Sequence, residues 1–392
     1  MNHRSAFATL TIIIFVLFAA SLWAVPPTDE VIQKLRDEGK LDQFVQMMAD
    51  ARARGVNNPT MLADKDGASA ALAGKQTYKA LVILVDFSDK VYTAGWAAGT
   101  PEDFDSLLFS TGKNPTGSMS EYYFENSYGN FTLQGTVVGW VRAAEGAGYY
   151  TGDCDGSHGM GSYPQNAQRL VEEAVDLADA SVDFSEFDNN GDGTVDGLFV
   201  VHAGTGYEES GNDCEIHSHQ WNISSRYRDG VRIYSYSIEP EETASQNRLS
   251  AIGVYCHEFG HVLGLPDLYD TDYSSSGAGY WELMASGSYN GSSQTPAGFS
   301  AWSKSKLGWL TLTNITSNQT DVSIPALAFN PAAYRLWKHG ATGSQYWIIE
   351  NRQRMGFDAA LPGDGLLIWH IDDAVGGNTN DWHPKVFLEQ AD

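Results

Sequence analysis

The strongest constraint on how this chain folds is segment 257–267, which reads His-Glu-Phe-Gly-His-Val-Leu-Gly-Leu-Pro-Asp. In a helix, His257 and His261 lie on one face, where two imidazoles can hold a single Zn²⁺. Glu258 lies beside them and can take a proton from a metal-bound water and pass it to a departing amine. Apolar residues surround these positions, so we expect a buried helix. They are Ile252, Val254, Tyr255, Phe259, Val262 and Leu263.

The residues after this helix predict a turn that returns the chain to the metal. Gly264 can adopt the positive φ that ends a helix, and Pro266 prevents the helix from resuming. The turn would deliver Asp267 as the third ligand, and Glu282 further along the chain is the alternative. Three protein ligands with one open position are typical of a catalytic zinc site, whereas a structural site is usually closed by four ligands.

Several segments beyond this motif resemble one family of enzymes, the M6 peptidases of the immune inhibitor A type, which are secreted bacterial zinc proteases. The similar segments are 120–129, 188–204, the helix with its turn, 281–287, 363–372 and 390–392. Together they cover most of the chain from about residue 78 onward.

The resemblance implies a metzincin-like catalytic domain in which His257, His261 and Asp267 bind zinc and Glu258 is the general base. It also implies that Met284 forms a methionine turn beneath the metal. Some metzincins carry a tyrosine two residues after that methionine. This chain has Ser286 there, so no tyrosine is assigned as a transition-state stabiliser, and Tyr289 is only a weak candidate.

The N-terminus predicts a secreted protein. An apolar run at 10–23 follows Arg4 and precedes Ala24 and the pair Pro26-Pro27, which is typical of a signal peptide cleaved near Ala24. A membrane anchor is the alternative, but the run is shorter than the roughly 20 residues that span a bilayer. We therefore expect residues 1–24 to be a signal peptide and the mature protein to be extracellular.

Composition and cysteine content narrow the function further. The formal charge is −25, from 49 acidic and 24 basic residues, which argues against nucleic acid as a partner but does not by itself select a substrate. The protein or peptide substrates that we expect are implied by the family resemblance. Of three cysteines, Cys154 and Cys214 lie in loop-like sequence and are the expected disulfide pair. Cys256 lies beside His257 and is expected to point into the core.

The fold class that we expect is α/β (α+β), with a twisted, mostly parallel sheet packed on the metal-binding helix and a β-rich C-terminal subdomain. Strands are predicted at 78–87, 132–141 and 198–202, and helices at 119–126 and 165–180.

The expected domains are a helical prosegment and linker at 25–75, a catalytic domain at 76–310 and a β-rich part at 311–392. Residues 29–54 have helical spacing, and an ordinary N-terminal helical cap is the alternative to a prosegment. Family members continue beyond the point where this chain stops, so we expect a truncated chain.

A second motif, at 188–196, predicts a calcium-binding loop. Its oxygen-bearing ligands would be Asp188, Asn190, Asp192 and Asp196. Phe199 stands where an EF-hand would supply a bidentate glutamate, so the match is incomplete. The alternative is a polar turn built on Asn-Gly and Asp-Gly pairs.

Three other histidines lie in strand-like sequence. His217 and His219 lie two apart and would share a face of a strand, but the interpretation that we favour is a role in the cleft wall or in hydrogen bonding. His370 lies on a predicted strand, and its role stays open.

The function favoured by the sequence is a secreted zinc endopeptidase that is made as a zymogen. A calcium- and zinc-binding surface or adhesion module without catalysis is the main alternative, and intact Glu258 argues against it. A zinc hydrolase that acts on a non-peptide amide is a third possibility.

Overall fold

The structure is a computed structural model that describes residues 24–56, 75–92, 99–244 and 248–390. The predicted signal peptide, apart from Ala24, and the predicted linker after the N-terminal helices lie outside the described residues. The helices are α1 Asp29–Asp37, α2 Leu41–Ala53, α4 Pro101–Phe109, α5 Met119–Asn126, α6 Ala167–Ala178, α7 Tyr207–Ser210, α8 Ile252–Val262 and α9 Ala301–Lys306. The strands are β1 Gln76–Asp86, β2 Phe131–Arg142, β3 Leu198–Thr205, β4 His219–Arg228, β5 Val231–Glu242, β6 Thr313–Ile315, β7 Tyr334–Leu336, β8 Gln345–Arg352, β9 Gly365–Asp372 and β10 Val386–Leu388. Short 3-10 helices are η1 Ala147–Thr151, η2 Asp179–Ser181, η3 Phe184–Phe187, η4 Gly279–Trp281, η5 Ser286–Tyr289, η6 Lys338–Gly340 and η7 Gly356–Ala360.

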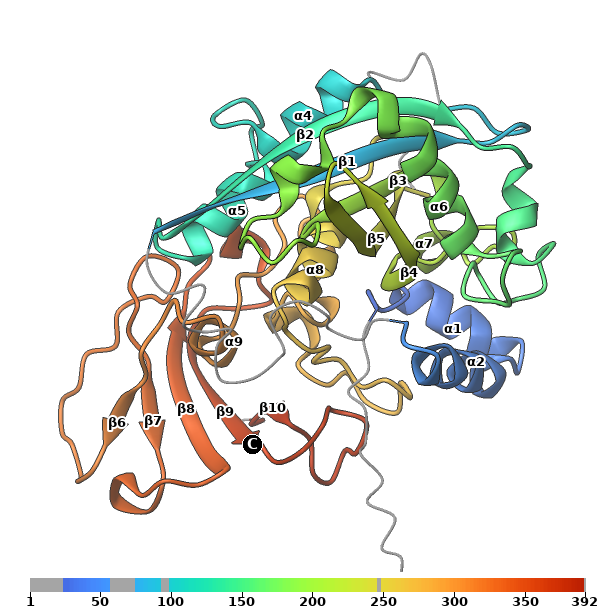
Figure 1. Cartoon of the computed structure of the whole chain (residues 1–392). Helices are drawn as coiled ribbons and strands as arrows, with labels where there is room; N and C mark the ends of the chain where they lie inside the picture. The colour runs from blue at the N-terminus through green and yellow to red at the C-terminus, as the bar shows by residue number, and fades with distance from the viewer. Residues whose placement is uncertain (1–23, 57–74, 93–98, 245–247, 391–392) are drawn as a thin grey trace, which may run out of the picture.

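The first sheet has the strand order β2-β1-β3-β5-β4, and only its edge strand β4 runs antiparallel to its neighbour. β1 carries the apolar run 80–85, in which every side chain is fully buried. Such a run suits a central parallel strand, because both faces of a parallel sheet are covered. The predicted mostly parallel, twisted sheet is confirmed, and Figure 1 shows α8 beneath it.

The two helices predicted inside this region are present. One is α5, with the predicted bounds, and the other is α6, which begins two residues later than expected. The later start has a local cause. The Asn166 side chain accepts a hydrogen bond from the backbone N–H of Arg169 at 3.2 Å, so Asn166 caps the helix and is not part of it.

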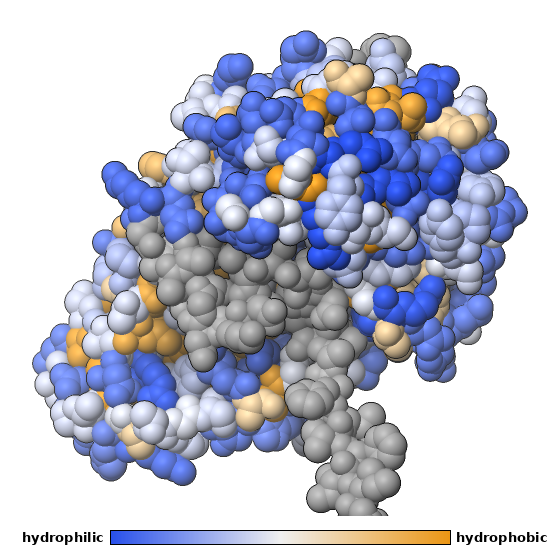
Figure 2. Space-filling model, viewed as in Figure 1, coloured by the Kyte–Doolittle hydropathy of each residue, from blue (hydrophilic) through white to orange (hydrophobic). Residues whose placement is uncertain are grey.

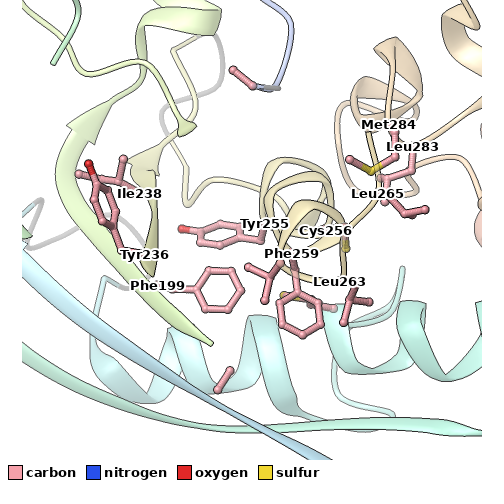
Figure 3. Packing of buried hydrophobic residues seen from close by; sticks show 14 of the residues in the cluster. Phe199, Tyr236, Ile238, Tyr255, Cys256, Phe259, Leu263, Leu265, Leu283 and Met284 are labelled. Carbon is pink, nitrogen blue, oxygen red and sulfur yellow. The ribbon is translucent and has the colours of Figure 1, made fainter. Parts of the chain in front are cut away.

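Helix α8 is buried along its whole length, as its apolar sequence predicts. The Phe259 ring lies 5.0 Å from the Tyr123 ring and 5.4 Å from the Tyr78 ring, both in edge-on geometry. Figure 3 shows Tyr255 and Phe259 beside Phe199 of β3, with Leu283 and Met284 on the far side of the helix. Because α8 is enclosed on both sides, its side chains have fixed positions.

Helices α1 and α2 form the helical segment predicted at 29–54. They lie near α7 and β4, at one side of the first sheet (Figure 1). The Phe44 ring of α2 lies 5.6 Å from the Tyr207 ring and 6.2 Å from the His217 ring. Val31, Ile32 and Leu35 of α1 are also buried. The two helices therefore dock through apolar side chains.

The second sheet has the order β10-β9-β8-β7-β6 and is antiparallel except for the β6–β7 pair. Its strand β8 delivers the fully buried Arg352, whose guanidinium contacts the carboxylates of Asp358 at 2.5 Å and Glu350 at 3.3 Å. Arg352 also donates to the carbonyl oxygens of Trp281 and Gly298, both at 3.0 Å. A buried ionic network therefore joins this sheet to the end of η4 through the Trp281 carbonyl.

Other features of the described residues agree with the sequence. Cys154 and Cys214 form a disulfide and Cys256 is a buried thiol, as predicted. The face drawn in Figure 2 is mostly hydrophilic, with hydrophobic residues in small separate areas. Within the described ranges, no helix combines the length and the apolar character needed to cross a bilayer.

Replacing Arg352 with Met should lower the free energy of unfolding by about 3 to 5 kcal/mol, because Asp358 and Glu350 would stay buried without their cation. The measurement is urea denaturation of the purified protein. Arg354→Met is the matched control. Its side chain is 47% exposed, lies 4.0 Å from Asp364 and donates to the Leu361 and Pro362 carbonyls, so that loss should be smaller, about 1 to 2 kcal/mol. Equal losses in the two variants would contradict the role given to the network.

Candidate metal centre

The two histidines of α8 point their Nε2 atoms toward one location. His257 Nδ1 is 2.9 Å from the Leu283 carbonyl oxygen, and His261 Nδ1 is 2.9 Å from the Leu265 carbonyl oxygen. A carbonyl oxygen only accepts hydrogen bonds, so each Nδ1 carries the proton and each Nε2 offers a lone pair. Metal-binding histidines are typically held in this way.

The glycine turn brings Asp267 to the same location. Gly264 has a φ of +93°, and the N–H groups of Gly264 and Leu265 donate to the carbonyls of His261 at 2.9 Å and Gly260 at 3.0 Å. These two bonds form a Schellman motif, which ends the helix and reverses the chain. The N–H of Leu268 then donates to the Met284 carbonyl at 2.6 Å, which fixes the far side of the turn.

The three side chains can share one metal ion. Asp267 Oδ1 is 3.0 Å from His257 Nε2 and 3.4 Å from His261 Nε2, and one ligand atom of each residue lies within 4.8 Å of the others. No other group of three His, Cys, Asp or Glu side chains in the described ranges gathers as closely. Two imidazole nitrogens and a carboxylate oxygen, all buried, fit the donor set of a catalytic zinc site.

The alternative ligand Glu282 is engaged elsewhere. Its carboxylate accepts hydrogen bonds from the Ser300 backbone N–H at 2.6 Å and from the Ser303 hydroxyl at 3.3 Å, both at the start of α9. Burial raises the pKa of Glu282 to about 7. The structure therefore brings Asp267, and not Glu282, together with the two histidines.

Glu258, the candidate base, is fully buried beside this group. Its Oε1 accepts a hydrogen bond from the Val25 N–H at 3.0 Å, and its Oε2 has no hydrogen-bond partner among the described residues. Burial raises the pKa of Glu258 to about 8. A divalent cation held by the neighbouring side chains would oppose that rise, because it favours the ionised carboxylate.

Met284 lies against α8, and the methionine turn proposed for it stays a prediction. It is fully buried, and a Cβ added to Gly260 would lie 2.4 Å from its Sδ atom. Only glycine at position 260, next to His261, allows the sulfur to approach so closely.

The sequence did not predict that residues 24–28, which we call the cleft segment, cross this centre. Ala24 N–H donates to Asp267 Oδ2 at 2.7 Å, beside the Val25–Glu258 bond described above. His217 Nε2 lies 3.0 Å from the Val25 carbonyl, and the Tyr289 hydroxyl donates to the Pro26 carbonyl at 2.5 Å. The one signal in the sequence was the pair Pro26-Pro27, which favours an extended backbone.

Two buried carboxylates near the centre were also missed. Burial, followed by the charge of Glu258, raises the pKa of Glu239 well above its ordinary value. Burial raises the pKa of Glu208 to about 7, although the Ser218 hydroxyl and N–H both donate to its carboxylate. Both residues become buried only when the chain folds, so no local pattern marks them.

The loop predicted to bind calcium is folded around its own side chains. Asp188 accepts from the N–H groups of Gly191, Asp192 and Gly193, and Asn190 Oδ1 accepts from Asp192 N–H. Asp196 accepts from Asn189 N–H, and burial raises its pKa to about 7. These bonds are equally typical of a polar turn, so the calcium site stays a prediction.

The strand residues His219 and His370 have defined neighbours. His219 contacts the His217 carbonyl and the Tyr236 hydroxyl, at 2.6 Å and 3.1 Å, in keeping with a hydrogen-bonding role. The His370 ring is stacked on the Trp347 ring in the second sheet, 5.2 Å between ring centres.

Comparison with known proteins gives consistent results. The family described as immune inhibitor A peptidase M6, catalytic domain, matches residues 67–310. A pre-pro-metalloprotease named PrtV from Vibrio cholerae is 33% identical over 281 residues, which cover 59% of this chain and 29% of that protein. An immune inhibitor A from Bacillus thuringiensis is 34% identical over 221 residues, covering 48% of this chain and 31% of that protein. The chain thus spans less than a third of the length of either relative.

Replacing Gly260 with Ala should lower the free energy of unfolding by about 1 to 3 kcal/mol, because the new methyl group would overlap the Met284 sulfur. Thermal and urea denaturation would measure the loss. Gly377→Ala is the control, since a Cβ there meets nothing within 4 Å. In a Gly260→Ala, Met284→Ala double variant, the shortened side chain at position 284 should no longer overlap the new methyl group. The double variant should therefore lose less unfolding free energy than the sum of the losses in the two single variants. Additive losses would show that the two residues do not interact.

Proposed function

The chain belongs to the immune inhibitor A family of M6 peptidases, and on this premise we propose that it is a secreted zinc-dependent endopeptidase. The observation that carries the proposal is the meeting of His257, His261 and Asp267 beside the buried Glu258. Three protein ligands and an adjacent carboxylate are the parts that metal-assisted hydrolysis requires.

In the proposed reaction, His257, His261 and Asp267 hold the zinc. A bound zinc ion supplies Lewis acidity, which makes a water molecule acidic near neutral pH and polarises the substrate carbonyl. Glu258 takes a proton from the attacking water and delivers it to the amide nitrogen as the C–N bond breaks. The bond between Val25 N–H and Glu258 Oε1 supports this role, because a peptide nitrogen reaches the carboxylate at 3.0 Å.

We also propose that residues 25–75 are a prosegment that keeps the enzyme latent. The support is that Val25, at the start of this prosegment, places its backbone N–H on Glu258 at 3.0 Å, so a substrate cannot reach that carboxylate while the segment stays. The docked helices α1 and α2 follow directly and anchor it. The Vibrio relative is named a pre-pro-metalloprotease, which agrees with a chain made in a longer, inactive form.

Replacing Glu258 with Ala should lower the rate of casein cleavage by at least about 100-fold without loss of metal, because the base is removed and the ligands stay. Metal content is measured by atomic spectroscopy, and casein cleavage is measured on the same samples. Chelation should abolish cleavage by the wild type, and added zinc should restore it. Zinc binding without cleavage by any processed form of the wild type would favour a binding module instead.

Replacing Phe44 with Ala should release the latent site, because truncating a buried phenylalanine weakens its packing by about 3 to 5 kcal/mol. We expect hydrolysis of a small fluorogenic peptide by the uncleaved chain to rise at least about 10-fold. Gln46→Ala, on the exposed face of the same helix, is the control and should change nothing. A Phe44→Ala chain that stays as inactive as the wild type would count against latency through this segment.

A further inference from the structure

The cleft segment shows how a peptide backbone can lie in this site. Ala24 and Val25 are fully buried, and their N–H groups bond to Asp267 at 2.7 Å and Glu258 at 3.0 Å. Further along, the Thr28 N–H donates to the Glu208 carbonyl at 2.8 Å. The segment is thus bonded at both ends, with its backbone running away from the metal ligands.

We propose that His217 and Tyr289 bind the substrate on its leaving-amine side: His217 donates to the carbonyl of the first residue after the scissile bond, and Tyr289 donates to the carbonyl of the second. This inference rests on the proposed endopeptidase function and adds the residues that position its substrate. In the cleft segment, the matching carbonyls are those of Val25 and Pro26.

The register follows from Glu258. The amide nitrogen that leaves during hydrolysis must receive a proton from the base, and the nitrogen beside the base here is that of Val25. Val25 therefore stands in for the first residue of the leaving fragment, and Pro26 stands in for the second. A substrate in this register presents its next two carbonyls to His217 and Tyr289.

His217 is held as a neutral donor. Its Nε2 faces the Val25 carbonyl at 3.0 Å, which can only accept, and its Nδ1 has no hydrogen-bond partner in the described part of the chain. Burial lowers the pKa of His217 well below its ordinary value, so the ring stays uncharged. The Tyr207 ring packs edge-on against it with 5.6 Å between ring centres, which limits its rotation.

Tyr289 is also a donor in a fixed position. It ends η5, the turn that follows Met284, and its hydroxyl reaches the Pro26 carbonyl at 2.5 Å. Burial raises the pKa of Tyr289 well above its ordinary value, so the phenol keeps its proton. Tyr289 thus donates a hydrogen bond to the substrate backbone, at the second residue after the scissile bond.

A consequence concerns sequence preference. Pro26 and Pro27 have no N–H group, and the site holds the first of them through its carbonyl. The substrates that we expect are therefore extended peptides, with proline tolerated at the second and third positions after the scissile bond.

The test pairs enzyme variants with altered substrates. The full chain is produced and processed by its host, and a fluorogenic peptide cut by the wild type is mapped by mass spectrometry to locate the scissile bond. A second peptide carries a thioamide in place of the carbonyl of the second residue after that bond, because sulfur is a weaker acceptor. Tyr289→Phe should lower kcat/KM about 3- to 10-fold on the normal peptide. On the thioamide peptide, it should lower kcat/KM less than about 2-fold.

Two further variants separate substrate contact from structural damage. Tyr280→Phe removes a hydroxyl that bonds to Asp29 instead, at 2.7 Å, and should leave kcat/KM within about 2-fold of the wild type. His217→Leu should lower kcat/KM on the normal peptide, as Tyr289→Phe does. The loss should shrink on a peptide whose thioamide replaces the carbonyl of the first residue after the scissile bond. His217→Gln keeps an N–H donor and should recover part of the lost kcat/KM. Metal content should be equal in all variants.

Equal losses on the normal and thioamide peptides, or no loss in either variant, would overturn the inference while leaving an active wild type and the proposed function intact. A wild type that holds zinc but cleaves no peptide would overturn the proposed function, and the inference with it.

Discussion

Two backbone carbonyls outside α8 give the two histidines of the candidate metal centre their direction. The Leu283 carbonyl accepts from His257, and the Leu265 carbonyl accepts from His261, each at 2.9 Å. Without these bonds either imidazole could turn or change tautomer, and the two Nε2 atoms would no longer face one point. The site therefore depends on the glycine turn and on the loop before η5, and Arg352 ties the end of η4, which precedes that loop, to the second sheet through the Trp281 carbonyl.

Three buried glutamates lie in the interior around the site. Glu208, Glu239 and Glu258 are all fully buried, and burial raises the pKa of each of them. Buried acids of this kind are costly unless a cation or several hydrogen bonds compensate them. A divalent ion on the His257–His261–Asp267 group would supply part of that compensation at the place where the proposed chemistry needs it.

The hydrogen bonds that the cleft segment makes with the site use its backbone atoms. Glu258, Asp267, His217 and Tyr289 all bond to N–H or carbonyl groups of residues 24–26. Any extended peptide carries most of these groups, so the same donors and acceptors can serve both a latent segment and a substrate. In the proposal of latency, the apolar docking of α1 and α2 holds the segment in place, and a free peptide lacks this docking.

The sequence alone determined the metal-binding helix, its glycine turn, the buried strand β1 and the helices at 29–54, because hydrophobic period and turn chemistry act over a few residues. It also favoured Asp267 over Glu282 as the residue that reaches the two histidines. The calcium loop and the signal peptide stay predictions. Only the tertiary structure decided that Ala24 would meet Asp267, that His217 would meet Val25 and that Arg352 would meet Trp281. These pairs are far apart in sequence, and their contact is set by how the intervening elements pack, which no local pattern encodes.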